Sequence, residues 1–172
     1  MMIARLGGVA RTVARRGFHS SPAVFAEEAT DAATQVTLNL TTPHAAIHEG
    51  VKVDMVIIPG VAGEYGVTAG HTPVVSELKP GVVQIFHDRN EEPEKYFLAA
   101  GFAATHPNSV TDLMAVEAVP LDDIDGDAAR KGLGEFKAAM DKAEAGSVER
   151  AEAQIGFEVH SAMCIALGLP TN

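Results

Sequence analysis

The hydrophobic period of this chain changes once, near Pro120, and that change limits the folds available to it. Between residues 35 and 118, apolar and polar side chains alternate in short runs such as Val36, Leu38 and Leu40, a pattern typical of half-buried strands. After Pro120, apolar residues recur at intervals of three and four, which indicates amphipathic helices. The order of the two patterns predicts an all-β sandwich followed by an α-helical hairpin, in two small domains.

Turn-forming residues divide the first part into short strands. We expect one strand from Gln35, a second run over 51–58, and further strands over 73–78, 81–87, 95–100, 102–106 and 110–118. The stretch PGVAGEYGVTAGHTPVVSELKPG, residues 59–81, holds five glycines, three prolines and one histidine. We expect its first part to be a rigid loop between strands, because glycines supply positive φ or close approach and prolines direct turns. The residues expected to shape it are Gly63, Gly66, Gly70, Pro80 and Gly81.

The helical part has recognisable ends. Three aspartates near Asp122 favour the start of a first helix over 122–145. Ser147 is a candidate N-cap for a second helix, which we expect to end near Leu167 because Gly168 follows. The apolar side of that second helix is predicted to comprise Val148, Ala151, Ile155, Val159, Ala162, Met163 and Ala166.

The first 25 residues have a composition unlike the rest of the chain. They carry four arginines, no acidic residue and the hydroxyl side chains of Thr12, Ser20 and Ser21. This composition is typical of a mitochondrial transit peptide; the alternative is a basic arm that binds an anionic partner. The predicted organisation is therefore a transit peptide over 1–25, a flexible lead-in over 26–34, a β-sandwich domain over 35–120 and a two-helix hairpin over 121–172.

Removal of the predicted transit peptide leaves nine basic residues against 23 acidic ones, a formal net charge of −14. A chain this acidic is repelled by phosphate backbones and anionic lipid headgroups. Nucleic acid and direct membrane adhesion are therefore poor partners, and a basic protein surface is a better one.

The histidine spacing and the glycine-rich stretch do not match the common motifs for metal binding or phosphate binding. His44 and His48 are four residues apart, which places them about 13 Å apart on an extended strand, too far to hold one ion. The glycine-rich stretch lacks the Lys and the following helix of a phosphate loop. We therefore expect no catalytic residue, no cofactor and no metal. One alternative remains, a small matrix β-barrel enzyme that holds a metal through His44, His71 and His87.

The glycine-rich stretch also carries a family signature. Gly63 to Gly81 reads GEYGVTAGHTPVVSELKPG and fits the pattern G-E-[YF]-G-[VI]-x-x-G-H-x-P-[LV]-[LV]-x-x-[LI]-K-P-G. With residues 94–125 and the two-helix end, this stretch resembles the F-type ATP synthase central-stalk subunit family, called delta in mitochondria and epsilon in bacteria. The arginine of the ATP-binding signature found in some bacterial members is missing after Asp125, so the resemblance implies no bound nucleotide.

The resemblance implies a non-catalytic rotor subunit on the matrix side of the mitochondrial inner membrane. It implies three partners: the gamma subunit, the small mitochondrial epsilon subunit and the c-ring, through which the protein is peripheral to the membrane. It also implies that the protein couples proton-driven rotation of the c-ring to gamma and so to ATP synthesis. The residues expected to face the c-ring are Glu64, Tyr65, His71 and Pro73.

Overall fold

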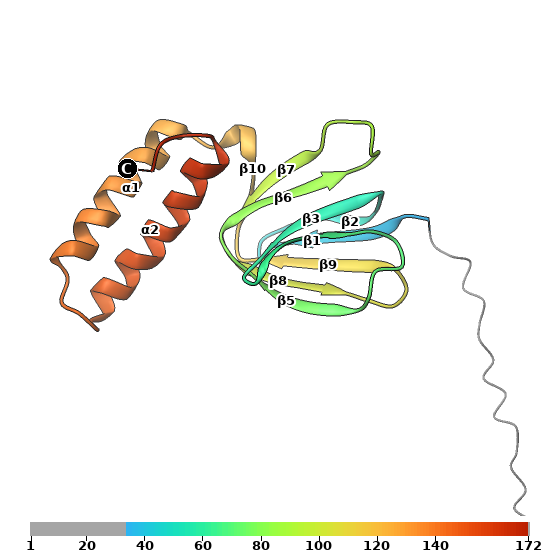
Figure 1. Cartoon of the computed structure of the whole chain (residues 1–172), viewed down its shortest axis with the longest axis horizontal. Coiled ribbons are helices and arrows are strands. Elements are labelled where there is room, and N and C mark those ends of the chain that lie inside the picture. The colour runs from blue at the N-terminus through green and yellow to red at the C-terminus, as the bar shows by residue number, and fades with distance from the viewer. Residues whose placement is uncertain (1–33, 172) are drawn as a thin grey trace, which may run out of the picture.

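The computed structural model of this chain describes residues 34–171. The predicted transit peptide, and all but the last residue of the predicted lead-in, lie outside this range. The described part consists of a body of strands with a pair of helices at one end, as Figure 1 shows. Strand β1 begins at the opposite end of the body from the helices.

The strands form a sandwich, as predicted. Their order is β10-β7-β6-β3-β5-β8-β9-β1-β2, with β4 paired to β3. Strand β1 runs parallel to β9, and the other pairings in the described part are antiparallel. The strands are β1 (Val36–Thr41), β2 (Ala46–Val53), β3 (Met55–Gly60), β4 (Gly63–Val67), β5 (Val74–Leu78), β6 (Gly81–Phe86), β7 (Glu94–Leu98), β8 (Gly101–Thr105), β9 (Val110–Ala115) and β10 (Ala118–Pro120).

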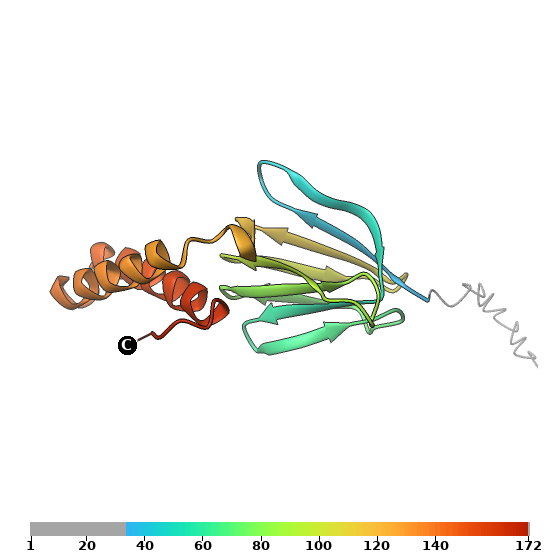
Figure 2. The ribbon, with the colours of Figure 1, turned by 90° about the horizontal axis from the view of Figure 1, so that it is seen from above.

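The core of the sandwich lies between its layers, which Figure 2 shows from above. The alternating residues of β1 (Val36, Leu38 and Leu40) are all fully buried, as their period predicts. They pack with aliphatic residues from the facing strands, such as Ile58 and Ile85. The core contains no Trp, so its stability depends on the close packing of branched aliphatic side chains.

Two of the predicted strands are divided in the structure. The run over 51–58 is broken at Asp54, which separates β2 from β3; the Asp54 carboxylate accepts hydrogen bonds from Gln35 Nε2 (3.1 Å) and from the backbone N–H of Arg89 (3.3 Å). The run over 110–118 is likewise divided into β9 and β10. Period alone could not show these breaks, because apolar residues continue on both sides of each one.

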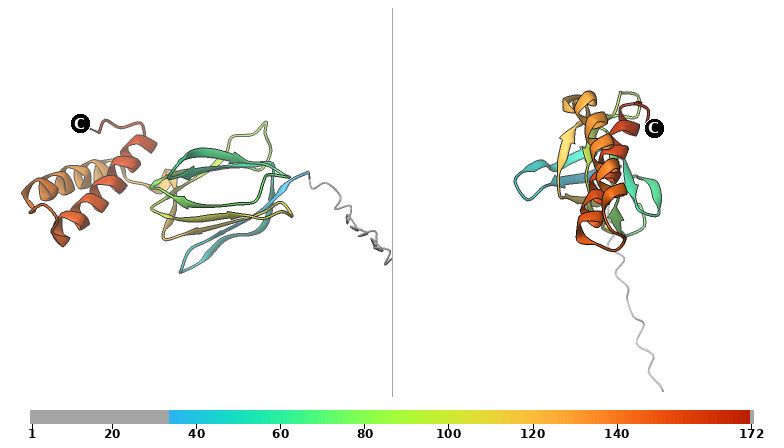
Figure 3. Two further views of the ribbon diagram at one scale, coloured as in Figure 1. Left: turned by 60° about the horizontal axis from the view of Figure 1, so that its bottom comes forward. Right: turned by 90° about the vertical axis from the view of Figure 1, so that its left-hand side faces the viewer.

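The helical hairpin is also present, with sharper limits than predicted. A short 3₁₀ helix η1 (Leu121–Asp123) precedes α1 (Gly126–Lys142), so the first α-helix begins later than expected. Asp125 is its N-cap and accepts from two backbone N–H groups of the first turn. Helix α2 (Val148–Ala166) begins at the predicted cap Ser147, whose Oγ accepts the N–H of Arg150. Figure 3 shows the two helices side by side beyond the end of the sandwich.

The face of α2 that packs on α1 is not the predicted one. Val148 and Ile155 are 69% and 64% exposed. The helices instead meet where glycines face rings: a Cβ added at Gly132 would lie 2.3 Å from the His160 ring, and one at Gly156 would lie 2.4 Å from the Phe136 ring. The prediction followed hydrophobicity, whereas close helix contact here depends on residues without side chains.

Candidate docking surfaces

The glycine-rich stretch forms a β-hairpin with β3, where the sequence predicted a loop. Glu64 and Tyr65 lie on β4, opposite Pro59 and Ile58 of β3. Because strand side chains alternate between faces, Glu64 is exposed while Tyr65 is half-buried against the core. The turn that follows, residues 68–73, contains His71 and Pro73.

The predicted shaping residues occupy different kinds of position. Gly63 and Gly70 have φ of 134° and 74°, where a side chain is strained. Gly81 has an ordinary φ, but a Cβ there would lie 3.0 Å from Pro59 Cβ, so this position allows the start of β6 to lie close to β3. At Gly66 an added Cβ would make only an ordinary contact with Met55. Pro80 is half-buried in the turn between β5 and β6.

The structure brings Tyr65 and His71 together. Their ring centroids are 6.3 Å apart, and the Tyr65 hydroxyl hydrogen-bonds the Ser76 hydroxyl on β5. His71 Nδ1 donates to the Thr72 carbonyl oxygen at 2.8 Å, in the tautomer with a proton on that nitrogen. Pro73 follows and is exposed. The turn that contains His71 and Pro73 therefore packs on Tyr65 through the His71 ring.

This turn is held at the end of the sandwich away from the helices. The N–H of Gly70 donates to Ser109 Oγ at 2.9 Å, which ties residues 68–73 to the turn between β8 and β9. Strand β1, which runs parallel to β9, starts at this same end of the body (Figure 1).

Glu64 lies at the other end of β4, next to the helices. It lines a crevice with the turn residues 79–82 and with Ala162, Ile165 and Ala166 of α2. From Glu64 to the end of β4 at Val67 the strand rises about 10 Å. The residues that the sequence grouped on one loop are therefore divided between two ends of the body.

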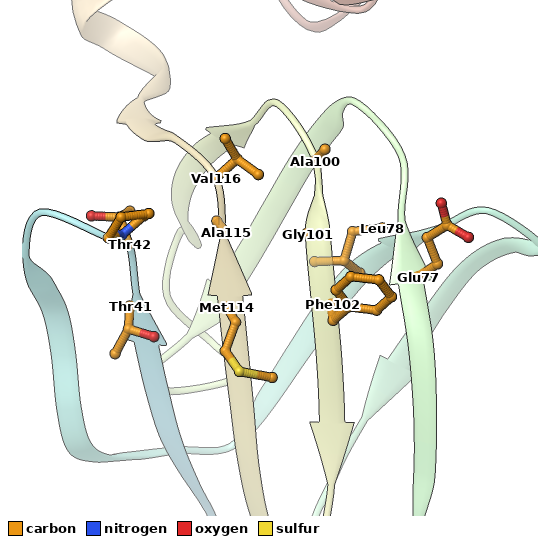
Figure 4. Close-up of a pocket in the computed structure, with 11 residues that line it drawn as sticks. Thr41, Thr42, Glu77, Leu78, Ala100, Gly101, Phe102, Met114, Ala115 and Val116 are labelled. Atoms are coloured by element: carbon orange, nitrogen blue, oxygen red, sulfur yellow. The ribbon is translucent and has the colours of Figure 1, made fainter.

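An apolar depression on the outer face of β5, β8 and β9 was not predicted. Phe102, Met114 and Val116 are 53%, 49% and 60% exposed. In Figure 4, Phe102 lies beside Met114, Val116 lies further along the chain from Met114, and Thr41 of β1 and Thr42 of the β1–β2 turn lie next to them. Val75 of β5 is the most exposed large aliphatic residue of this sheet face, at 74%. A sequence signal did exist, since the strands that form this face carry apolar residues on both faces rather than alternating.

A second cluster joins polar groups from separate strands. Glu94 Oε2 lies 3.2 Å from His48 Nε2 of β2 and 2.9 Å from His87 Nε2, just after β6. The Tyr96 hydroxyl donates to Glu94 Oε1 at 2.7 Å. The sequence indicated His48 and His87 only as possible metal ligands, and no motif showed that they meet at a carboxylate.

The cluster shifts the titration of two of its members. Burial alone would raise the pKa of Glu94, but hydrogen bonds from Tyr96 and His87 and the charges of the two histidines outweigh it, so the pKa is lowered from 4.5. Burial, together with the hydrogen bond to Glu94, raises the pKa of Tyr96 to about 12. Glu94 therefore stays ionised over the neutral range.

The alternative metal site does not assemble. His44 is exposed in the β1–β2 turn, His71 lies in the 68–73 turn, and His87 belongs to the Glu94 cluster. Within residues 34–171, the side chains of His, Cys, Asp and Glu form no group of three or more with the geometry to hold a metal ion.

No helix in this range combines the length and the hydropathy needed to cross a bilayer.

The sequence is similar to that of a known family. A profile described as ATP synthase, Delta/Epsilon chain, beta-sandwich domain matches residues 35–120. The mitochondrial ATP synthase subunit delta′ of Ipomoea batatas is 48% identical over 134 residues, which is 78% of this chain and 66% of the relative. This chain therefore spans just under two thirds of that relative. The mitochondrial ATP synthase F(1) complex subunit delta of Dictyostelium discoideum is 35% identical over 151 residues, 88% of each chain.

The fold agrees with this similarity. A chain in the cryo-EM structure of the Euglena gracilis mitochondrial ATP synthase, OSCP/F1/c-ring in rotational state 1, has a TM-score of 0.72 at 30% identity, covering 78% of this chain and 82% of that one. A chain of the Tetrahymena thermophila ATP synthase central stalk and c-ring has a TM-score of 0.51 at 12% identity, which supports the fold alone. The sequence match, the sandwich and the terminal hairpin agree, and the chain belongs to the ATP synthase delta/epsilon chain family.

Proposed function

We propose that this protein is a non-catalytic central-stalk subunit of the mitochondrial ATP synthase, on the matrix side of the inner membrane, which couples rotation of the c-ring to the gamma subunit and ATP synthesis. The observation that carries the proposal is the 35% identity over 88% of both chains with a protein named as the F(1) complex subunit delta. The similar fold in a structure titled with F1 and the c-ring supports it.

The exposed apolar depression supports a role in binding a partner. At its border, the hydroxyls of Thr41 and Thr42 donate to the backbone carbonyls of Leu113 and Ala45. Exposed apolar area of this kind marks a protein interface. We assign the depression to the gamma subunit and place the small epsilon subunit beside it on the same stalk.

The turn that contains His71 and Pro73 is assigned to the c-ring. It lies at the end of the sandwich away from the hairpin, and Gly70 and Ser109 hold it in place. A stiff body with interfaces at separate places suits a subunit that transmits torque. The segment over 1–25 is proposed to be the transit peptide that delivers the protein to the matrix.

Purification tests the proposed function. ATP synthase isolated from mitochondria that express a tagged form of this protein should contain it in fixed ratio to gamma and the c-ring, even after a high-salt wash. Recovery of the tagged protein as a free small species, with a stoichiometric metal, would instead support the enzyme alternative.

A surface variant tests the assignment of the depression. We expect Val116→Asp to lower incorporation into the complex at least several-fold, because it buries a charge in an apolar interface. Val61→Asp, at a 57% exposed valine outside the depression, is the matched control. Both variants should unfold within about 0.5 kcal/mol of the wild type, as exposed substitutions usually do. Equal incorporation of the two variants would argue against this docking face.

A further inference from the structure

The His48–Glu94 cluster joins the two ends of the strand order. Strand β2 is the last strand at one end and pairs only with β1 within the described sheet. At the other end, β10 covers β7 at Tyr96, Phe97 and Leu98, and the pairing does not reach Glu94. His48 and Glu94 are each paired on one side, with β1 and β6 respectively, and each lies on a strand whose other edge has no backbone partner at that position. Their side chains therefore connect two edges that no backbone ladder connects.

The geometry of His48 indicates an inward-facing side chain. Its side chain is 14% exposed, and its Nε2 is buried without a well-aligned hydrogen bond in the described chain. The contact that offsets this burial is the 3.2 Å approach to the Glu94 carboxylate. Its ring also packs edge-on against the Tyr96 ring, with centroids 5.7 Å apart. An unpaired buried polar atom is costly, so the ring depends on Glu94 to stay in this position.

The backbone of β2 is shaped to bring the ring there. The β1–β2 pairing has register shifts on both sides of Leu40, which lies opposite His48. Gly50 takes a φ of 66°, and its N–H donates to Asn39 Oδ1 at 2.7 Å. Bulges of this kind redirect side chains. They place His48 opposite a core residue instead of leaving it on the solvent side.

The position of β2 bears on the apolar depression. The turn that joins β1 to β2 is closed by hydrogen bonds between Thr42 and Ala45. Thr41 at the end of β1, with Thr42 and Pro43 of this turn, forms one wall of the depression, beside Met114 and Val116 (Figure 4). A change in how β2 is held therefore moves a wall of the docking face.

We propose that His48, His87, Glu94 and Tyr96 form a clasp that closes the sandwich between β2 and β7, and that the clasp holds the β1–β2 hairpin in the position that completes the docking depression. His48 and Glu94 are positioning residues, since they act on the depression through the hairpin and do not line it. The identity of the partner that binds the depression rests on the proposed function. The existence of the clasp does not depend on it.

Hydrogen exchange of the purified protein tests the clasp. In His48→Gln and in Glu94→Gln, amides of β2 should exchange about tenfold faster than in the wild type, because the charge-assisted contact that restrains the hairpin is removed. Amides of β8 should keep their protection. His106→Gln is the matched control: His106 Nε2 also lies close to a carboxylate, 2.8 Å from that of Asp112, but this pair links the end of β8 to β9, two strands that are already joined by backbone hydrogen bonds.

Two results of the exchange experiment would overturn the clasp. One is unchanged exchange of β2 in both variants. The other is equal acceleration of β2 and β8, which means that the cluster contributes only general stability. Faster β2 exchange in His106→Gln would equally contradict a specific connection between β2 and β7.

Incorporation into ATP synthase tests the link to the docking face. We expect His48→Gln and Glu94→Gln to lower incorporation in the same direction as Val116→Asp, and His106→Gln to leave it unchanged. If Val116→Asp impairs incorporation but the clasp variants do not, the clasp does not position the surface. If Val116→Asp has no effect, the assignment of the depression fails, and the exchange data alone decide whether the clasp exists.

Discussion

Glu94 illustrates how single residues in this protein depend on partners from other strands. Its carboxylate accepts from Tyr96 and His87 and faces His48, so its pKa is lowered in the folded state. A group whose pKa is lowered on folding contributes stability that is present above the unfolded value and is lost as the pH falls through the folded value. The stability that Glu94 contributes is therefore lost below pH 4.5.

We predict that the stability difference between the wild type and Glu94→Gln shrinks as the pH falls below about 4.5, because protonation of Glu94 makes the two side chains alike. Urea unfolding at a series of pH values measures this difference. Tyr96→Phe removes one hydrogen-bond donor to Glu94, so the pKa of Glu94, followed by NMR titration, should move closer to 4.5. A difference that persists unchanged at pH 3 would contradict the lowered pKa.

His71 and Glu64 provide a second prediction at this scale. The structure places His71 on the turn at the free end of the sandwich and Glu64 in the crevice beside α2. We therefore expect His71→Glu to lower ATP-driven proton pumping per ATP hydrolysed more than Glu64→Lys does. Stability should change little in either variant, since exposed charges contribute little to it. Equal losses of coupling would mean that both ends of β4 meet the ring.

At the scale of elements, the helical hairpin depends on two glycines at its crossing. Gly132 faces His160, and Gly156 faces Phe136. The core between the helices is small: the buried residues are Ala129, Gly132 and Leu133 of α1 and Ala153 and Cys164 of α2, with half-buried neighbours around them. Close approach of the two backbones is therefore the main way in which this hairpin buries area.

Helix α1 offers a matched pair of substitutions. Gly134→Ala should stabilise the protein by about 1 kcal/mol, because alanine is the better helix former and an added Cβ meets open space. Gly132→Ala should destabilise it by roughly 1–3 kcal/mol, because the new Cβ overlaps the His160 ring and forces overpacking. Thermal unfolding of both variants distinguishes the two effects. A stabilised Gly132→Ala would mean that the ring moves aside freely.

At the scale of the whole molecule, residues 34–171 contain two separate hydrophobic clusters, one in the sandwich and one in the hairpin. They share no residue, and α2 touches the sandwich mainly through β6. A small helical pair with so few buried residues gains much of its stability from contacts outside itself. The sandwich, by contrast, has a core of its own.

We therefore expect a chain that ends after Pro120 to keep a cooperative unfolding transition, with a midpoint within about 10 °C of the intact protein. Calorimetry of the truncated and intact proteins measures it. The full-length Gly132→Ala variant is the control, because it keeps the hairpin attached while its packing is disturbed. Loss of any cooperative transition in the truncated chain would show that the sandwich needs the hairpin.

The sequence by itself determined the local features of this protein. Three local features were readable because each depends on neighbours a few residues away: the alternation in β1, the Ser147 cap, and the end of α2 just before Gly168. At that end, the Leu169 N–H donates to the Cys164 carbonyl. The order of strands before helices and the family signature at Gly63–Gly81 were readable for the same reason. Together they were sufficient for the fold class and the family.

Only the tertiary structure decided which residues share a surface. The sequence placed Glu64 and His71 on one loop, but pairing of β4 with β3 divides them between two ends. It gave no sign that His48 meets Glu94, 46 positions later, because a bulge redirects the ring and strand order sets its neighbour. Docking faces arise where strands distant in the sequence lie side by side, and the period of a strand carries no information about which strand that will be.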